Sequence, residues 1–220
     1  MLINQIYEQL IKDLGPQGWW PGDNTLEIII GAVLTQSVNW SNVEKAITKM
    51  KAADVLNEEF ILSCSTEELG DYIRSTLYYR QKARKLKVLF NWLNEQCQFD
   101  YDQLFSRPAM ELRPQMLSLW GMGKETVDSI LCYAGELPVI VIDAYTRRIF
   151  YRLGLTPEDA SYDELQDLLT ICLPRDVKVY NEMHALLVRV GADYCRNKKP
   201  RCQLCPLNNK CNLGKQEIIA

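Results

Sequence analysis

Apolar residues recur at three- and four-residue spacing along almost the whole chain, and this periodicity limits the fold to packed α-helices. The pattern is clear from residue 2 to residue 14, where Gly15-Pro16 ends it. The one candidate for an extended segment is PVIVI at residues 138–142. It is too short and too isolated to build a sheet, so we expect a buried connector. The sequence therefore predicts an all-α fold.

Similar helical patterns follow one another down the chain. The predicted helices cover residues 2–14, 26–36 (capped by Asn24-Thr25), 42–52 (opened by Trp40-Ser41), 57–63, 65–75, 79–96, 101–105, 108–117, 126–133, 144–153, 162–171 and 177–194, with a short turn near 206–211. No Gly/Ser-rich linker or repeat divides the chain. If two lobes exist, we expect them to share helices across a cleft, a common place for a ligand.

The formal net charge of −3 argues mildly against a nucleic-acid partner, because nucleic-acid-binding domains are usually basic. The basic residues are nevertheless clustered. They lie in RQKARKLK at 80–87, at Arg147, Arg148 and Arg152, and at Lys198, Lys199 and Arg201. A basic face on an acidic protein still binds phosphate, so charge alone does not decide the partner.

No apolar run approaches the roughly 20 residues that cross a bilayer. The N-terminal segment carries Glu8, Lys12 and Asp13 inside an amphipathic pattern, so it predicts neither a signal peptide nor a membrane anchor. We therefore expect a cytoplasmic protein with no membrane partner.

Eight cysteines in a cytosolic chain do not predict disulfides. Four are scattered among apolar neighbours, as is typical of buried thiols: Cys64, Cys97, Cys132 and Cys172. The other four form C-x6-C-x2-C-x5-C in a loop too polar to be core: Cys195, Cys202, Cys205 and Cys211. Converging thiolates indicate zinc or iron–sulfur. Zinc sites usually have two close cysteine pairs, whereas this loop has one, so the spacing favours a 4Fe–4S cluster.

This spacing resembles the cysteine loop of the endonuclease III superfamily of helix–hairpin–helix DNA glycosylases, and the resemblance covers residues 20–213. It implies a mainly structural 4Fe–4S cluster, with basic residues in the first part of the loop that touch the DNA backbone. Lys198, Lys199 and Arg201 are the candidates, although a solvated charge run accounts for them equally well.

Residues 117–134, LSLWGMGKETVDSILCYA, contain Gly121 and Gly123 in a tight turn between two helical patterns. Glycine permits positive φ and lets a phosphate approach the backbone amides, and the N-terminus of the next helix attracts the same anion. A G-x-G turn alone is a weak signal. Within L-x-G-x-G-x-x-T it resembles the family's helix–hairpin–helix motif, which implies that both glycines clamp a DNA phosphate and that Lys124 adds positive charge.

Asp143 stands in VIDAYTRRIF between a buried apolar run and a helix, about 20 residues beyond the hairpin glycines. Aspartate at such a boundary is a good N-cap. The resemblance also implies that Asp143 is the catalytic carboxylate, and the two roles are compatible because helix amides hold a capping carboxylate rigidly. Breaking an N-glycosidic bond develops positive charge on the sugar. A fixed carboxylate stabilises that charge and orients water toward C1′.

In bifunctional relatives a lysine directly before the hairpin-helix threonine attacks C1′ and forms a Schiff base. Here Glu125 precedes Thr126, and Lys124 lies one residue earlier. One residue turns a side chain by about 100° around a helix, so Lys124 should not replace that lysine. The sequence therefore predicts a monofunctional glycosylase. The alternatives are a bifunctional glycosylase/AP lyase for oxidised pyrimidines and a non-catalytic DNA-structure binder or redox sensor.

The segment LEIIIGAVLTQSVNWSNVEKAI resembles the family segment whose glutamine fills the hole left by a flipped base, so Gln36 is the candidate plug. A solvent-facing glutamine at a helix end is nearly as good an interpretation. Trp19 and Trp20 stand in a Pro/Gly-framed loop, with Trp40 after the glutamine. Together with Glu125 they resemble the 3-methyladenine branch, in which aromatics sandwich the damaged base and this glutamate lies in the pocket. Indole faces attract a cationic base, so the predicted substrate is double-stranded DNA carrying an alkylated purine.

The resemblance implies two helical lobes. One is a six-helix barrel with the hairpin at residues 24–134, and the other combines residues 1–23 and 135–220 and carries the cluster loop. We expect a monomer that lies on the nucleoid when it is bound to DNA. The single histidine, His184, falls within the predicted helix 177–194 and is assigned no chemistry. With one histidine and no G-x-S-x-G, we do not expect a serine hydrolase.

Overall fold

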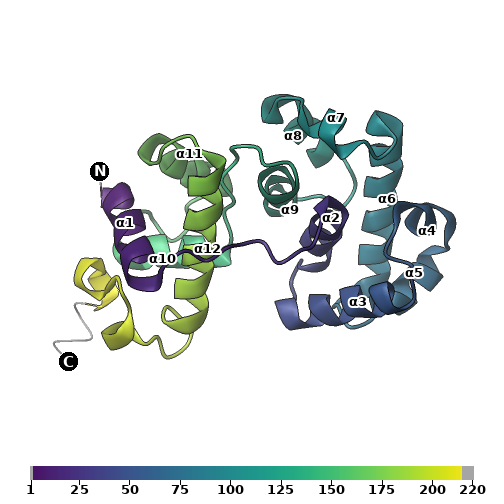
Figure 1. Ribbon diagram of the computed structural model, residues 1–220. Coiled ribbons are helices and arrows are strands. Elements are labelled where there is room, and N and C mark those ends of the chain that lie inside the picture. The colour runs from purple at the N-terminus through teal and green to yellow at the C-terminus, as the bar shows by residue number, and fades with distance from the viewer. Residues whose placement is uncertain (1, 215–220) are drawn as a thin grey trace. The chain divides into compact units, whose positions relative to one another are not determined.

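The computed structural model describes residues 2–214, which form helices joined by loops, with no strand among them (Figure 1). The prediction of an all-α fold is confirmed. The chain forms two compact units. Unit 1 combines residues 2–20 and 138–214, and unit 2 covers residues 21–137.

Unit 2 is built around the apolar helix α2. Its elements are α2 (Thr25–Leu34), α3 (Trp40–Ala52), α4 (Glu58–Ser63), α5 (Thr66–Tyr72), α6 (Tyr79–Cys97), α7 (Tyr101–Phe105), α8 (Ala109–Leu117), α9 (Lys124–Ser129) and the π-helical turn η1 (Ile130–Ala134). Helix α2 is buried along most of its length, as expected for a helix that is apolar on all sides. It packs against α3, α6, α9 and η1. This packing brings the end of α2 close to the helix that follows the two-glycine turn.

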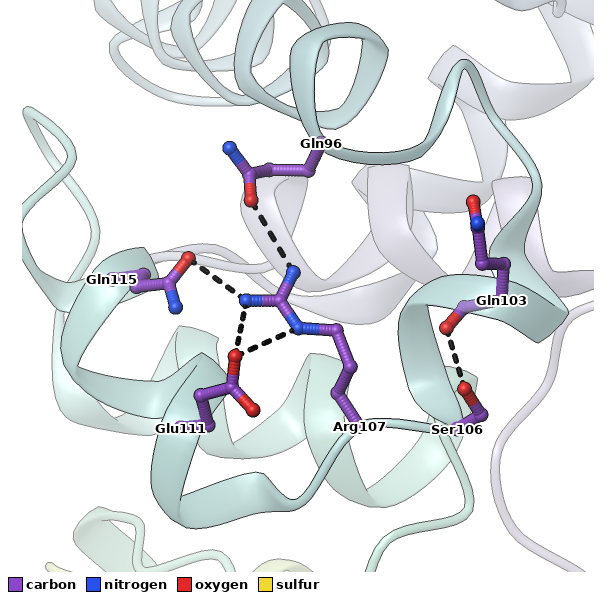
Figure 2. A network of polar contacts seen from close by, with 6 residues as sticks. All are labelled: Gln96, Gln103, Ser106, Arg107, Glu111 and Gln115. Atoms are coloured by element: carbon purple, nitrogen blue, oxygen red, sulfur yellow. Dashed lines mark hydrogen bonds and ion pairs between the residues drawn. The ribbon is translucent and has the colours of Figure 1, made fainter.

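The long helix α6 supports the rest of unit 2, with α4, α5 and α7 packed against it. At its C-terminal end, Arg107 links α6 to the α7–α8 corner (Figure 2). Its guanidinium donates to the side chains of Gln96 at 3.2 Å, Glu111 at 2.8 Å and Gln115 at 3.3 Å. These bonds fix α8 relative to α6, and α8 leads directly into the hairpin.

Unit 1 surrounds a single apolar core. Its elements are α1 (Leu2–Leu14), α10 (Ala144–Leu153), α11 (Tyr162–Cys172), α12 (Val177–Asp193) and the short 3-10 turns η2 (Cys202–Leu204) and η3 (Asn208–Lys210). Helix α12 packs against both α10 and α1 (Figure 1). The core draws on all of these helices, through Ile6, Phe150, Leu169 and Leu186 among others.

The connector predicted at residues 138–142 is confirmed, because Ile140, Val141 and Ile142 are buried and adopt no regular secondary structure. Several helix boundaries were predicted wrongly by two or three residues, among them the end of α2, which lies at Leu34. The helix predicted over 65–75 ends at Tyr72, where Ile73 leaves helical geometry and accepts a turn hydrogen bond from Thr76. The helix predicted from 126 begins at Lys124, because Gly123 already serves as its N-cap. Within residues 2–214, no helix has both the length and the apolar character needed to cross a membrane.

Candidate active site

Asp143 is the N-cap of α10. Its Oδ1 accepts hydrogen bonds from the Thr146 backbone N–H at 2.7 Å and from the Thr146 hydroxyl at 2.8 Å. Its Oδ2 lies 3.7 Å from Nε2 of the buried His184. Burial by itself would raise the pKa of Asp143, but His184 and the Thr146 hydrogen bonds outweigh it and hold that pKa below its usual range. The carboxylate is therefore ionised and held in one orientation.

The hairpin turn between α8 and α9 uses its two glycines differently. Gly121 has a φ of +82°, a left-handed conformation that favours glycine, and a Cβ there would come within 2.7 Å of Lys85 side-chain carbons. Gly123 has a φ of −94°, and a Cβ there would meet nothing within 4 Å. The first glycine is thus required by the turn itself. The second leaves open space beside the first backbone amides of α9.

Gln36, the predicted plug residue, is held by side chains of unit 2. Its Nε2 donates to Thr126 Oγ1 at 2.8 Å and to the Gly121 carbonyl at 3.4 Å. Its Oε1 accepts from Lys85 Nζ at 2.5 Å. A solvent-facing glutamine does not fit these contacts. Gln36, Lys85 and the hairpin turn instead form one linked cluster.

Two lysines of α6 are close to one another here, the half-buried Lys85 of this cluster and the buried Lys82. Lys82 is 1% exposed, and its Nζ donates to the Leu34 carbonyl at 2.8 Å. Burial, with a smaller contribution from the charge of Lys85, lowers the pKa of Lys82 to about 8. Burial also lowers the pKa of Lys85. Burial therefore disfavours the charged form of both lysines, of which Lys85 lies against Gly121 of the hairpin and Lys82 against the end of α2.

Glu125 and Lys124 lie in the first turn of α9. Glu125 is exposed, and its backbone carbonyl accepts from the Ser129 hydroxyl at 2.7 Å. Lys124 is the first residue of the helix, directly after the Gly123 cap. Thr126 behind them is buried and bonded to Gln36. Glu125, which directly precedes Thr126, therefore offers a carboxylate and no amine at this position.

The three tryptophans predicted to line the base pocket fall into different units. Trp19 and Trp20 of unit 1 pack edge to face, with ring centroids 5.8 Å apart and planes at 77°. Trp40 of unit 2 opens α3, and its Nε1 donates to Glu44 at 3.0 Å. The two indole rings of unit 1 therefore stand nearly perpendicular to each other and in contact.

The four clustered cysteines line one cavity in unit 1, with an empty volume of about 270 Å³ that is partly open to solvent. Burial, together with the charges of Cys195, Cys202 and Cys211, raises the pKa of Cys205 to about 11. All four cysteines line this cavity, and a cationic centre bound there would stabilise them as thiolates. Within residues 2–214, no three His, Cys, Asp or Glu side chains form a group that could hold a metal ion.

Arginines of α10 connect the helix that begins at Asp143 to the cysteine loop. Arg148 donates to the carbonyls of Cys195 at 2.7 Å and Gly191 at 3.1 Å. Arg152 donates to the Arg196 carbonyl at 2.7 Å and approaches Cys195 Sγ at 3.4 Å. The basic residues predicted to touch DNA lie exposed in the same loop: Lys198, Lys199 and Arg201.

A family model described as the HhH-GPD superfamily of base excision DNA repair proteins matches residues 30–174. This range includes Gln36, the hairpin and Asp143. The chain belongs to this superfamily. Its enzymatic class is that of the DNA N-glycosylases, and its nucleic-acid partner is DNA.

Individual HhH-GPD proteins are similar over nearly the whole chain. A Methanocaldococcus jannaschii protein, named as a candidate DNA repair glycosylase, is 41% identical over 96% of this chain and 96% of its own length. A solved endonuclease III trapped as a covalent intermediate with DNA has a TM-score of 0.83 and 25% identity, covering 99% of each chain. H. pylori 3-methyladenine DNA glycosylase bound to 1,N6-ethenoadenine has a TM-score of 0.68 and 27% identity, covering 85% of this chain and 94% of the other.

Sequence reasoning missed two side chains that contact the predicted site residues. His184 was assigned no chemistry, yet it faces Asp143 from a helix 41 residues further along the chain. Lys85 was seen only as part of a basic run, yet it contacts both Gln36 and Gly121. The single histidine was a usable signal, because it is the one imidazole in the sequence that could pair with a carboxylate. Nothing in the local sequence distinguished Lys85 from its basic neighbours.

Proposed function

We propose that the protein is a monofunctional DNA glycosylase that hydrolyses the N-glycosidic bond of a flipped, damaged base in double-stranded DNA. The observation that carries this proposal is the Asp143 carboxylate, which is ionised and held at the N-terminus of α10 by Thr146 and His184. A rigid anion of this kind matches the positive charge that develops on the sugar as the base departs.

The reaction follows from this geometry. The bond between C1′ and the base nitrogen breaks, and its electron pair leaves with the base. Asp143 stabilises the resulting sugar cation and orients a water molecule toward C1′. As the water oxygen bonds to C1′, Asp143 accepts the water proton. The products are the free base and an abasic site.

Glu125 supports hydrolysis rather than attack by an amine. A carboxylate cannot form a Schiff base with C1′. Lys124 is one residue earlier, at the first position of α9, and points in a different direction around the helix. With no amine directly before Thr126, water is the nucleophile and the DNA strand remains uncut.

For the base, we propose an N-alkylated purine. Such a base carries positive charge, which electron-rich indole faces attract. The perpendicular Trp19 and Trp20 rings offer two aromatic faces, and Glu125 adds a negative charge. Departure of a cationic base as a neutral molecule needs little acid catalysis. The similarity to the H. pylori 3-methyladenine DNA glycosylase supports this class.

The DNA contacts and the cofactor complete the proposal. Gly121 and Gly123 clamp one backbone phosphate, with Lys124 adding charge, and Gln36 fills the gap left by the flipped base. Lys198, Lys199 and Arg201 contact a second part of the backbone. A 4Fe–4S cluster held by Cys195, Cys202, Cys205 and Cys211 stabilises that loop, and four soft thiolate donors around one cavity suit it. The protein acts as a monomer.

The test uses single-turnover base release from duplexes that carry one lesion each: an alkylated purine, an ethenoadenine, an oxidised purine, an oxidised pyrimidine, and uracil or thymine opposite guanine. We expect the alkylated purine to be released, and Asp143→Asn to slow its release by about 10³-fold or more while DNA binding persists. Release of oxidised pyrimidine without alkylpurine would overturn the substrate class.

Borohydride trapping tests the monofunctional mechanism separately. We expect no covalent complex between wild-type protein and DNA. A trapped complex that disappears in Lys124→Ala would show that Lys124 acts as a nucleophile after all. A protein that binds DNA but releases none of the bases would be a DNA-structure binder.

A further inference from the structure

The two oxygens of the Asp143 carboxylate have different surroundings. Both hydrogen bonds from Thr146 end on Oδ1, so the helix cap uses that oxygen. Oδ2 takes no part in these two bonds, and Nε2 of His184 lies 3.7 Å from it. His184 is 5% exposed on α12, the helix that packs against α10. A buried imidazole is therefore directed at the oxygen that must face the sugar.

We propose that His184 is a positioning residue for the glycosylase reaction, holding Oδ2 of Asp143 ionised and in one orientation. The inference rests on the function proposed above. Thr146 restrains only one carboxylate oxygen, and a terminal carboxylate torsion is otherwise broad. A second contact on Oδ2 removes this remaining freedom. Preorganisation of this kind lowers the reorganisation needed when the sugar becomes cationic.

The other charged side chains of α10 and α12 near this point have partners elsewhere. On α10, Arg147 donates to the Ala160 carbonyl, and Arg148 donates to carbonyls at and beyond the end of α12. On α12, Glu182 accepts from the Gln17 backbone at 2.6 Å. Tyr180, one turn before His184, is buried. His184 and Thr146 are the groups that lower the pKa of Asp143 against the effect of burial.

The proton that matters is the one on Nε2. With a proton on that nitrogen, His184 donates toward Oδ2, whereas an Nε2 without a proton would place two acceptors against each other.

The experiment compares His184→Leu, which removes the donor, with His184→Gln, which keeps an N–H donor without an imidazole. Single-turnover base release is measured across pH, alongside DNA affinity and thermal unfolding. We expect His184→Leu to slow release about 10- to 100-fold, the range typical of groups that orient a functional ligand. The acid limb of its pH profile should move to higher pH, because Asp143 loses a group that lowers its pKa. His184→Gln should recover part of the rate, and DNA affinity should not change.

Folded His184 variants with the wild-type rate and the wild-type acid limb would overturn the positioning role. If His184→Leu does not fold, the glutamine variant and the wild-type ¹⁵N NMR spectrum decide. The chain has one histidine, so its ring nitrogens give one set of signals. A spectrum in which Nε2 carries no proton anywhere in the active pH range would also overturn the inference. Base release that survives in Asp143→Asn would instead overturn the proposed function, so the two failures are distinguishable.

Discussion

Asp143 in unit 1 and the lysines Lys82 and Lys85 in unit 2 are all ionisable groups inside the protein, yet their surroundings affect them in opposite ways. Burial disfavours the charged form of each. At Asp143, hydrogen bonds and the nearby imidazole outweigh burial, and the carboxylate stays ionised. At Lys82 and Lys85, burial dominates and the ammonium form is weakened. Unit 1 thus keeps its carboxylate ionised, whereas in unit 2 Lys82 and Lys85 serve as hydrogen-bond donors to the Leu34 carbonyl and to Gln36.

The difference predicts how each region responds to a lost partner. A buried ionised group that depends on its partners is left uncompensated when they are removed, whereas a buried group that can release its proton becomes neutral instead. Four changes test this contrast, and they are ordered by the size of the expected effect.

The largest effect is expected at a buried ion pair beside the hairpin. Arg113 of α8 makes two hydrogen bonds to the fully buried Asp128 of α9, at 2.6 and 3.0 Å. Arg113→Met takes this guanidinium away from a carboxylate that is fully buried in unit 2, which should destabilise the protein by about 3–5 kcal/mol. Urea unfolding measures the loss. The exposed Arg74–Asp71 pair is the control, and Arg74→Met should change stability little. Equal effects in the two variants would mean that burial does not make Asp128 depend on Arg113.

The second prediction concerns the pH dependence of stability. The pKa of Lys82 falls from its ordinary 10.5 in the unfolded chain to about 8 in the fold. Between about pH 8 and 10.5 the unfolded chain holds a proton that the folded chain has released, so stability rises with pH. The destabilisation that comes from burying the charged Lys82 is fully present below pH 8. As the pH rises from about 8 to 10.5, it should be relieved by up to about 3 kcal/mol.

The measurement is the free energy of unfolding in urea at several pH values in this window. Lys82→Met should lose this part of the pH dependence, whereas Lys45→Met, at an exposed position on α3, should keep it. An unchanged slope in Lys82→Met would mean that the buried ammonium stays charged. Lys82 would then resemble Asp143, and the contrast between the units would fail.

The third prediction separates the two hairpin glycines. Gly121→Ala should destabilise the protein by about 1–2 kcal/mol, because alanine disfavours positive φ and its Cβ would push Lys85 aside. Gly123→Ala should leave stability nearly unchanged, since its φ is ordinary and the space is open. It should nevertheless weaken DNA binding by filling the approach to the α9 amides. Thermal unfolding and a DNA-binding titration together check this, and unaltered DNA binding in Gly123→Ala would contradict the phosphate clamp.

The sequence predicted the local parts of this arrangement well. Helical periodicity located α6 and α10, and the boundary position of Asp143 predicted its capping role, because these features depend on neighbouring residues. The partners that give the site its electrostatics come from distant segments. His184 reaches Asp143 only because α12 packs against α10. Lys85 reaches Gly121 only because the hairpin folds back onto α6. Such contacts depend on tertiary packing, which a single sequence does not specify.

The smallest effect is expected at Thr146, which holds Asp143 through two groups. Thr146→Val removes the hydroxyl donor but keeps the backbone N–H on Oδ1. One hydrogen bond to a charged acceptor contributes about 1.5–3 kcal/mol. Because the backbone N–H still caps Oδ1 in Thr146→Val, we expect a loss at the lower end of this range, which corresponds to base release that is about tenfold slower. The acid limb of the pH profile should shift upward, since a group that lowers the pKa of Asp143 is gone. Thr146→Ser, which keeps the hydroxyl, is the matched control. If Thr146→Val slowed the reaction as much as His184→Leu, both carboxylate oxygens would matter equally, and the division between a capping and a reacting oxygen would be wrong.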